Sequence, residues 1–281
     1  MAARGWRCGV DARAAHRWPD TSGQRTPSAP ESIRRRLTGV LAGWREHGLD
    51  YPRGITANAR RWVDDYHAKL IEHRQPTGRG KAAPLTVAGI RKIVTSIRSD
   101  TSARYPGLAK ARDIALVLMA FSIAGRQSEL AFLDVDDIEP HESGMYVHVR
   151  RSKTGARKPK VKFGDHDATC PVLAWRRWQE ISGITEGAAF RTVSRHGHLG
   201  GRMSGDAVSA AIGRAGKRAG VEAHLTGHSA RRGLATEARR AGGAVEKIAD
   251  QGGWKRGSTV LLGYIDDVDG WSDNVLAGIG L

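Results

Sequence analysis

Residues near the C-terminus combine side chains that can act together on a phosphate. His228 and Arg231 stand three residues apart within residues 226–236, so on a helix they share one face. An imidazole beside a guanidinium suits an anion, above all a phosphate, because both groups donate hydrogen bonds to oxygen. Tyr264 follows a short helix later, and its hydroxyl can act as a nucleophile. The spacing therefore predicts attack by a tyrosine on a phosphate of DNA.

The charge of the chain favours a polyanionic partner. Its 281 residues, enough for one large domain or two smaller ones, carry a formal net charge of +16. Residues 1–82 hold 16 Lys and Arg against 8 Asp and Glu, so the N-terminal third is the more densely basic part. The alternative is an ordinary basic surface that keeps the protein soluble.

The cysteine and histidine content predicts neither a disulfide framework nor a metal site. Cys8 and Cys170 lie far apart, as expected in a reducing compartment. His224 and His228 have i,i+4 spacing, but no carboxylate or thiol cluster joins them. We therefore expect no metal and no cofactor. No apolar run approaches about 18 residues, and the N-terminus lacks the apolar segment of a secretory signal, which favours a cytoplasmic protein associated with the nucleoid.

Composition divides the chain into three parts. Residues 1–27 are polar and aperiodic, and we expect a flexible N-terminal arm. Residues 28–82 contain two amphipathic helices, the first capped by Ser28 with Glu31 three residues later, and two helices bury a small core at best. A basic linker rich in Pro and Gly follows at residues 75–84, so residues 83–281 form the third part.

The third part is expected to be mainly α-helical with a small β element, an α+β fold. Apolar residues at helical spacing follow Thr86, a predicted cap, and residues 108–124 form an apolar run typical of a buried central helix. Asp134, Asp136 and Asp137 are interpreted as a helix-to-strand connection. The remaining expected elements are a β-hairpin formed by residues 144–150 and 158–163, a Gly-rich loop at 182–203, and helices at 171–181, 206–218, 228 onward and 244–250.

Taken singly, the other candidate residues have ordinary interpretations. Arg126 can cap a helix or pair with Glu129 on the same turn. Lys153, in the turn of the predicted hairpin, is by default a solvated lysine. Trp254 and Tyr264 can be packing residues of the core.

The order of these residues carries more information than any one of them. Arg126 and Glu129 come first, then Lys153 in a hairpin, and then the spaced pair of His228 and Arg231. Trp254 after a glycine and Tyr264 complete the series. In this order they resemble the tyrosine recombinase family, of the phage integrase type, over residues 84–281.

The resemblance implies a role for each residue. Arg126 and Arg231 would hold the non-bridging oxygens of the scissile phosphate and stabilise the transition state. His228 would bond the same phosphate and help to manage the proton of the nucleophile. Trp254 stands where many relatives carry histidine; its indole N–H donates one bond but cannot transfer a proton.

The resemblance also implies the chemistry of cleavage. Lys153 would be the general acid for the leaving 5′-hydroxyl, and Tyr264 would form a 3′-phosphotyrosyl bond. Glu129 would orient the arginine turn. Because the covalent link retains the energy of the phosphodiester, rejoining needs neither ATP nor metal. Double-stranded DNA would be the partner, bound by a homo-tetramer on paired sites that exchange strands through a Holliday junction.

Three departures from the family pattern stand out. Arg232 replaces the histidine common after Arg231, and Trp254 lies ten positions before Tyr264, one more than usual. Residues 28–82 match only part of the helical, SAM-like core-binding domain that relatives carry. A divergent domain, a mis-assigned start codon and a truncated integrase all remain open. The DNA-binding residues expected in this partial domain are Arg34, Arg35, Arg36, Arg60 and Arg61.

The C-terminal tail and two rival functions complete the sequence-based hypotheses. Trp271, Val275 and Ile279 share a helical stripe, and the resemblance implies that the tail docks on a neighbouring protomer. The alternative is that the tail docks on its own domain. The first rival is a truncated DNA-binding relative that has lost cleavage. The second is a nicking-closing enzyme similar to the type IB topoisomerases. The sequence does not specify the target site or the direction of recombination.

Overall fold

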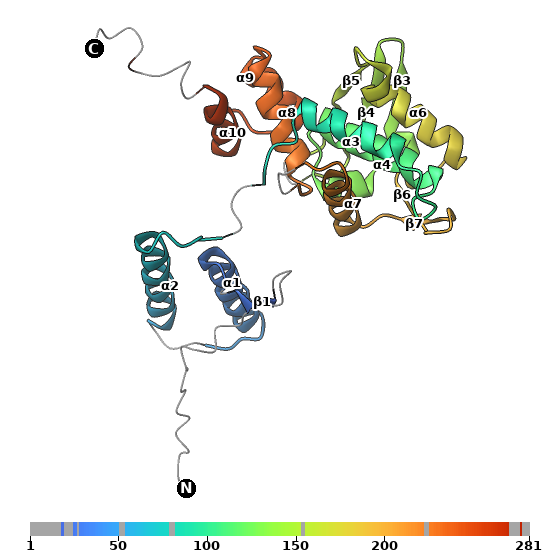
Figure 1. Cartoon of the computed structure of the whole chain (residues 1–281). Coiled ribbons are helices and arrows are strands. Elements are labelled where there is room, and N and C mark those ends of the chain that lie inside the picture. Colours follow the sequence, from blue (N-terminus) through green and yellow to red (C-terminus); the bar gives the residue numbers. More distant parts are fainter. Residues whose placement is uncertain are drawn as a thin grey trace. The chain divides into compact units, whose positions relative to one another are not determined.

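The computed structural model describes residues 18–19, 25–26, 28–50, 54–78, 82–152, 155–221, 225–269 and 276. The chain forms two compact units, Met1–Lys81 and Ala82–Leu281, and each is described by itself (Figure 1). None of the helices in the described ranges is long and apolar enough to cross a membrane.

The first unit contains a pair of helices, α1 (Pro30–Glu46) and α2 (Ile55–Glu72). Within residues 28–50 and 54–78, only Pro30, Leu41 and Val63 are buried, as expected for a small core with little hydrophobic stabilisation. The predicted cap at Ser28 is wrong. Helix α1 begins after Ala29 without a side-chain cap, and Pro30 occupies the first helical position, where its missing N–H costs nothing.

The predicted N-terminal arm lies mostly outside the described residues. Within it, β1 (Trp18–Pro19) and β2 (Arg25–Thr26) form a short antiparallel pair. Two-residue strands leave too little periodicity for a sequence pattern to reveal them.

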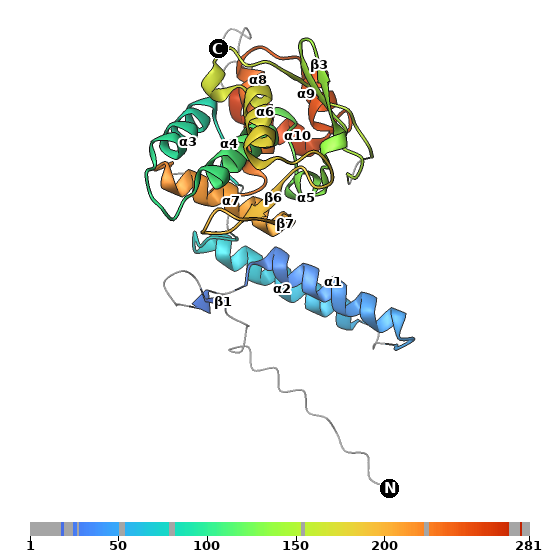
Figure 2. The same cartoon turned by 90° about the vertical axis from the view of Figure 1, so that its right-hand side faces the viewer.

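The second unit is built around α4 (Gly107–Ser122), which confirms the predicted central helix: residues 115–120 are all buried. Helix α4 contacts α3, α6, α7 and α8, and Figure 2 shows α3 and α6 on either side of it. Thr86 caps α3 by accepting a bond from the Gly89 N–H at 3.0 Å, as predicted. The helices other than α4 are α3 (Val87–Ser99), α5 (Gln127–Phe132), α6 (Pro171–Ser182), α7 (Gly205–Arg218), α8 (Ser229–Arg240), α9 (Val245–Gly252) and α10 (Thr259–Asp269).

Two small antiparallel sheets accompany these helices. The first has the order β3 (Ile138–His141), β4 (Gly144–Val147) and β5 (Lys160–Lys162), with Met145 opposite Val161. It confirms the predicted hairpin and adds β3. The second pairs β6 (Arg191–Val193) with β7 (Leu199–Arg202). The mainly α fold with a small β element is confirmed.

The structure contains strands that the sequence analysis did not predict. Residues 182–203 were predicted as a loop, but β6 and β7 pair within them. Strand β3, which follows the predicted connection, was not assigned. These strands are only three or four residues long, and β3 contains a proline while β7 contains two glycines. Neither shows the apolar alternation that marks a half-buried strand.

The segment before α3 holds α8 in place. The Leu85 N–H donates to the Ser229 carbonyl at 2.9 Å, and the Val87 N–H donates to the Glu237 carboxylate at 3.3 Å. At Gly233, a Cβ would lie 2.1 Å from the Leu85 oxygen, so only glycine permits this approach. The first residues of the second unit thus hold α8 in position.

Candidate active site

Arg126 lies at the start of α5, directly after the turn that ends α4. The turn passes through Ala124, whose φ of 47° is in the left-handed region that glycine usually occupies. The Arg126 N–H donates to the buried Glu129 carboxylate at 3.1 Å, and its guanidinium donates to the same carboxylate and to Ser152 Oγ. These bonds set the orientation of the guanidinium.

Glu129 is a buried carboxylate held in its charged form. Burial alone would raise its pKa, but Arg157 and the hydrogen bonds from Arg126 and Ser152 hold that pKa below its ordinary value. The Arg157 guanidinium donates to Glu129 at 2.7 Å. A charged carboxylate at this point is the acceptor that fixes both arginines.

Arg231 lies in the first turn of α8 and is almost fully buried. Its Nη1 donates to the Ala124 carbonyl at 2.9 Å and to the Gly252 carbonyl at 2.5 Å, while its Nη2 is buried without a hydrogen-bond partner among the described residues. Burial, followed by the charge of Arg126, lowers the pKa of Arg231. One nitrogen thus holds two carbonyls, and the other has no hydrogen-bond partner among the described residues.

Trp254 and Tyr264 pack beside Arg231. The Arg231 guanidinium lies over the Trp254 ring, 3.7 Å from its centroid. Trp254 meets Tyr264 edge to face, with centroids 6.3 Å apart and planes at 78°. The Trp254 Nε1 is buried without a hydrogen-bond partner among the described residues. A Cβ on Gly252 would clash with the indole ring, so the packing of Trp254 requires glycine at position 252.

Helix α10 carries Tyr264 and packs against α8 through a small apolar cluster. Leu261 and Ile265 are buried in it with Ala235 and Trp254. Their spacing of four residues places both on one face of α10, which leaves Tyr264 half-buried at the edge. The position of the hydroxyl therefore depends on the seating of α10 on α8.

Arg232 also contacts the tyrosine. Its guanidinium lies 5.6 Å from the centroid of the Tyr264 ring, and its Nη1 donates to the Ala82 carbonyl at 2.8 Å. Arg232, which replaces the histidine common in the family, thus contacts both Ala82 and Tyr264.

His228 occupies the N-cap position of α8 without a capping hydrogen bond, and its side chain is exposed. Partial desolvation, followed by the charges of Arg231 and Arg126, lowers its pKa below the ordinary 6.5. The imidazole is consequently neutral at pH 7 in the free protein and able to accept a proton.

This electrostatic coupling yields a pH prediction. In an NMR titration of the free protein, the His228 resonances should titrate below 6.5. In Arg126→Gln the midpoint should move upward, because one of the charges that disfavours the imidazolium is gone. A His228→Asn spectrum assigns the signal. A midpoint that does not move in Arg126→Gln would show that the two side chains are not coupled.

The structure brings most of the sequence-predicted site residues together. Arg126, His228, Arg231, Trp254 and Tyr264 are linked by the contacts and charges described above. Lys153 lies outside the described residues. Among the residues described, no group of three or more His, Cys, Asp and Glu side chains is arranged to hold a metal ion.

The aspartates after α5 have structural partners. Val135–Asp137 forms a 3₁₀ turn that leads into β3, which confirms the predicted connection. Arg150 pairs with Asp134 at 2.6 Å and with Asp137 at 2.5 Å. Paired in this way, these carboxylates tie the sheet to the end of α5.

The five candidate DNA-binding arginines lie in the first unit. Arg34 pairs with Asp64 of α2 at 2.5 Å, and Arg35 is within 3.9 Å of Glu31. Arg36 donates to Ser28 Oγ at 3.4 Å. The side chains of Arg35, Arg36, Arg60 and Arg61 are exposed, whereas Arg34 is half-buried.

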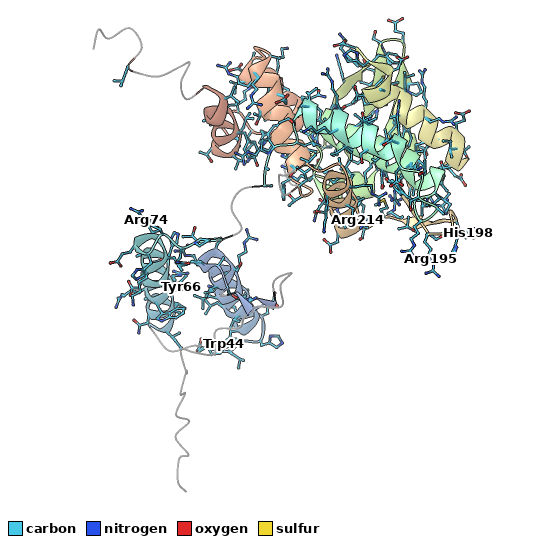
Figure 3. All side chains as sticks on the ribbon, in the orientation of Figure 1. Trp44, Tyr66, Arg74, Arg195, His198 and Arg214 are labelled. Atoms are coloured by element: carbon cyan, nitrogen blue, oxygen red, sulfur yellow. The ribbon has the colours of Figure 1, made fainter. Side chains whose placement is uncertain are left out.

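Two features were missed by sequence reasoning. One is Arg157, which nothing in the sequence distinguishes from the nearby Lys158 or Lys160. The other is a basic edge of the second unit, where the exposed Arg195 and His198 of the β6–β7 connection and Arg214 of α7 project from the same side (Figure 3). The sequence did contain an indication of this basic edge, because the predicted helix 206–218 carries Arg214 and Lys217 at outer positions.

The fold and the site define a mainly helical domain in which arginines, a histidine, a tryptophan and a tyrosine lie together. Residues 85–269 match the phage integrase family, and the chain belongs to that family. An integrase/recombinase xerD homolog from Selenomonas ruminantium is 29% identical over 137 residues, which are 47% of this chain and 40% of that relative. The match thus spans less than half of the relative's length.

Solved structures share the fold. The XerA recombinase superposes with a TM-score of 0.50 and 20% identity, over 84% of this chain and 78% of that one. The XerH site-specific recombinase, in a post-cleavage complex with its palindromic difH substrate, gives a TM-score of 0.51 and 12% identity, over 87% and 69%. Identities this low establish similarity of fold alone.

Proposed function

We propose that this protein is a site-specific recombinase that cuts and rejoins DNA strands with Tyr264. The tyrosine oxygen attacks the scissile phosphorus and forms a 3′-phosphotyrosyl bond, while the 5′ oxygen leaves and takes up a proton. A 5′-hydroxyl attacking the same phosphorus reverses the step and releases the tyrosine. Membership of the phage integrase family supports this reaction, and the XerH structure, which contains a DNA substrate after cleavage, supports DNA as the target.

One observation carries the proposal: two buried donors near Tyr264 have no acceptor among the described residues. They are Arg231 Nη2 and Trp254 Nε1. A buried donor without an acceptor costs about 1–3 kcal/mol, so such donors are retained where a ligand satisfies them. A tetrahedral phosphate bound beside Tyr264 would accept a hydrogen bond from each donor. The Tyr264 oxygen would then attack its phosphorus.

The site residues divide the work. Arg126 and Arg231 hold the non-bridging oxygens and stabilise the charge of the transition state. His228, neutral before DNA binds, bonds the phosphate and takes up the tyrosine proton. Trp254 contributes one hydrogen bond. Lys153 is proposed as the acid that protonates the 5′ oxygen.

The proposal extends to assembly and DNA contact. Residues 28–82 act as a partial core-binding domain, with the five arginines of α1 and α2 on the DNA backbone. The +16 charge favours this partner and makes affinity sensitive to salt. Four protomers exchange strands between two sites through a Holliday junction, in the cytoplasm at the nucleoid. The basic edge near Arg214 supplies further contacts.

A covalent-trap assay tests this function. The full chain is mixed in EDTA with nicked duplexes tiled across the DNA that flanks its gene, and adducts that survive SDS are digested and sequenced by mass spectrometry. We expect an adduct at Tyr264 on a 3′ phosphate, with a free 5′-hydroxyl on the other fragment. DNA binding without an adduct would instead indicate a relative that has lost cleavage.

A further inference from the structure

Arg157 places a second buried guanidinium beside the active site. It lies opposite Val149, and the two residues exchange both backbone hydrogen bonds, at 2.9 and 3.1 Å. This bridge continues the antiparallel pairing of β4 with β5. Only 8% of the Arg157 side chain is exposed, although arginine is rarely buried without a specific set of acceptors.

The Arg157 guanidinium connects three segments of the site. Its Nη2 donates to Glu129 at 2.7 Å. Its Nη1 donates to the carbonyls of Ile123 and Gln251, both at 2.9 Å. Ile123 precedes the Arg126 turn, Glu129 orients Arg126, and Gln251 lies just before Trp254.

The contacts of Arg157 run parallel to those of Arg231. Arg231 joins the carbonyls of Ala124 and Gly252, and Arg157 joins those of the preceding residues, Ile123 and Gln251. All four carbonyls lie at the C-terminal ends of α4 and α9, where the partial charge is negative and attracts cations. Two guanidiniums therefore hold the same pair of helix ends together.

We propose that Arg157 is a positioning residue for strand cleavage: it fixes Arg126 through Glu129 and fixes the approach to Trp254 through Gln251. The inference rests on the proposed function and adds a residue to it. Arg157 touches neither Tyr264 nor the place for the phosphate in the contacts described, so it acts through the residues that do.

The effect of the Arg157 charge on Glu129 distinguishes a positioning role from a contribution to packing alone. Three arginines act on Glu129: Arg126 at the start of α5, Arg157 of the hairpin and Arg231 of α8. Ser152 adds a hydrogen bond. Without Arg157, the largest stabilising charge is lost and the pKa of Glu129 rises, so a falling pH protonates the carboxylate that orients Arg126. A packing defect has no such dependence on pH.

The test compares Arg157→Met, which keeps much of the shape without the charge, with Arg157→Lys. Arg112→Met is the control, because Arg112 is equally buried but pairs with Asp113. Single-turnover adduct formation is measured on saturating nicked duplex from about pH 6 to about pH 8, together with DNA affinity, melting temperature and the Trp254 indole N–H resonance. About 100-fold slower cleavage by Arg157→Met is expected, as for small displacements of catalytic groups.

Three further results are expected. The loss in Arg157→Met deepens as the pH falls, Arg157→Lys is intermediate with the wild-type pH profile, and the indole resonance moves in Arg157→Met but not in Arg112→Met. An Arg157→Met variant with wild-type cleavage, or with a pH-independent loss and an unmoved indole resonance, would overturn the inference. If the wild type forms no adduct, the proposed function fails; the indole resonance still decides whether Arg157 positions the Trp254 segment.

Discussion

The Tyr264→Phe variant is expected to bind DNA normally and to form no covalent adduct. The phenylalanine ring can keep the edge-to-face contact with Trp254 and the place of α10 on α8, so the substitution removes little besides the nucleophilic oxygen. Loss of a catalytic nucleophile lowers turnover by about 10⁴-fold or more. In the SDS-resistant adduct assay, the signal should fall below detection.

The control for this prediction is Tyr146→Phe. Tyr146 lies in β4, where Lys158 packs over its ring, and its hydroxyl has no part in the proposed reaction. This variant should form the adduct at the wild-type rate. Persistent adduct in Tyr264→Phe would place the nucleophile on another residue and would overturn the assignment of α10 as the catalytic helix.

The Arg231→Lys variant is expected to slow cleavage by about 10²- to 10³-fold, the usual effect of losing one donor to a transition state. The guanidinium places one nitrogen, Nη1, on two carbonyls and leaves a second, Nη2, without a partner among the described residues, which in the proposed reaction binds the phosphate. An ammonium has a single nitrogen and cannot do both. The variant should also lose about 1–3 kcal/mol of stability, because a buried carbonyl of Ala124 or Gly252 loses its donor.

Stability and chemistry can be separated by the matched variant Arg112→Lys. Arg112 is buried in a pair with Asp113 and donates to the Arg191 carbonyl, so this substitution should lower the melting temperature to a similar extent. Its single-turnover cleavage on saturating DNA, corrected for the folded fraction, should stay at the wild-type rate. Equal losses of cleavage in both variants would mean that Arg231 is structural only.

Trp254 gives the site a particular chemical character. The indole N–H donates a hydrogen bond but does not give up its proton at neutral pH, so in the proposed reaction proton transfer falls to His228 and Lys153. The lowered pKa of His228 suits this task, because a neutral imidazole can accept the proton of the tyrosine. The Trp254 ring also covers one face of the buried Arg231.

The sequence by itself determined the chemistry-bearing residues and the helices that carry them. Arg126, His228, Arg231, Trp254 and Tyr264 could be selected because their order along the chain resembles a known family, although each of the residues taken singly has an ordinary interpretation. The apolar run before residue 124 predicted α4 since a buried central helix needs apolar residues on every side. The Thr86 cap was visible because capping is a local interaction.

Only the tertiary structure decided how these residues are held. Arg157 bonds Ile123, Glu129 and Gln251, which are separated from it by up to 94 positions, and no local pattern records such a contact. The same holds for the close approach of Leu85 to Gly233, which requires glycine because two backbones touch there. Arg231 Nη2 and Trp254 Nε1 lack hydrogen-bond partners among the described residues because folding buries them away from water. Burial and long-range contact are properties of the folded chain, so the sequence predicted the reacting groups and the fold determined their geometry.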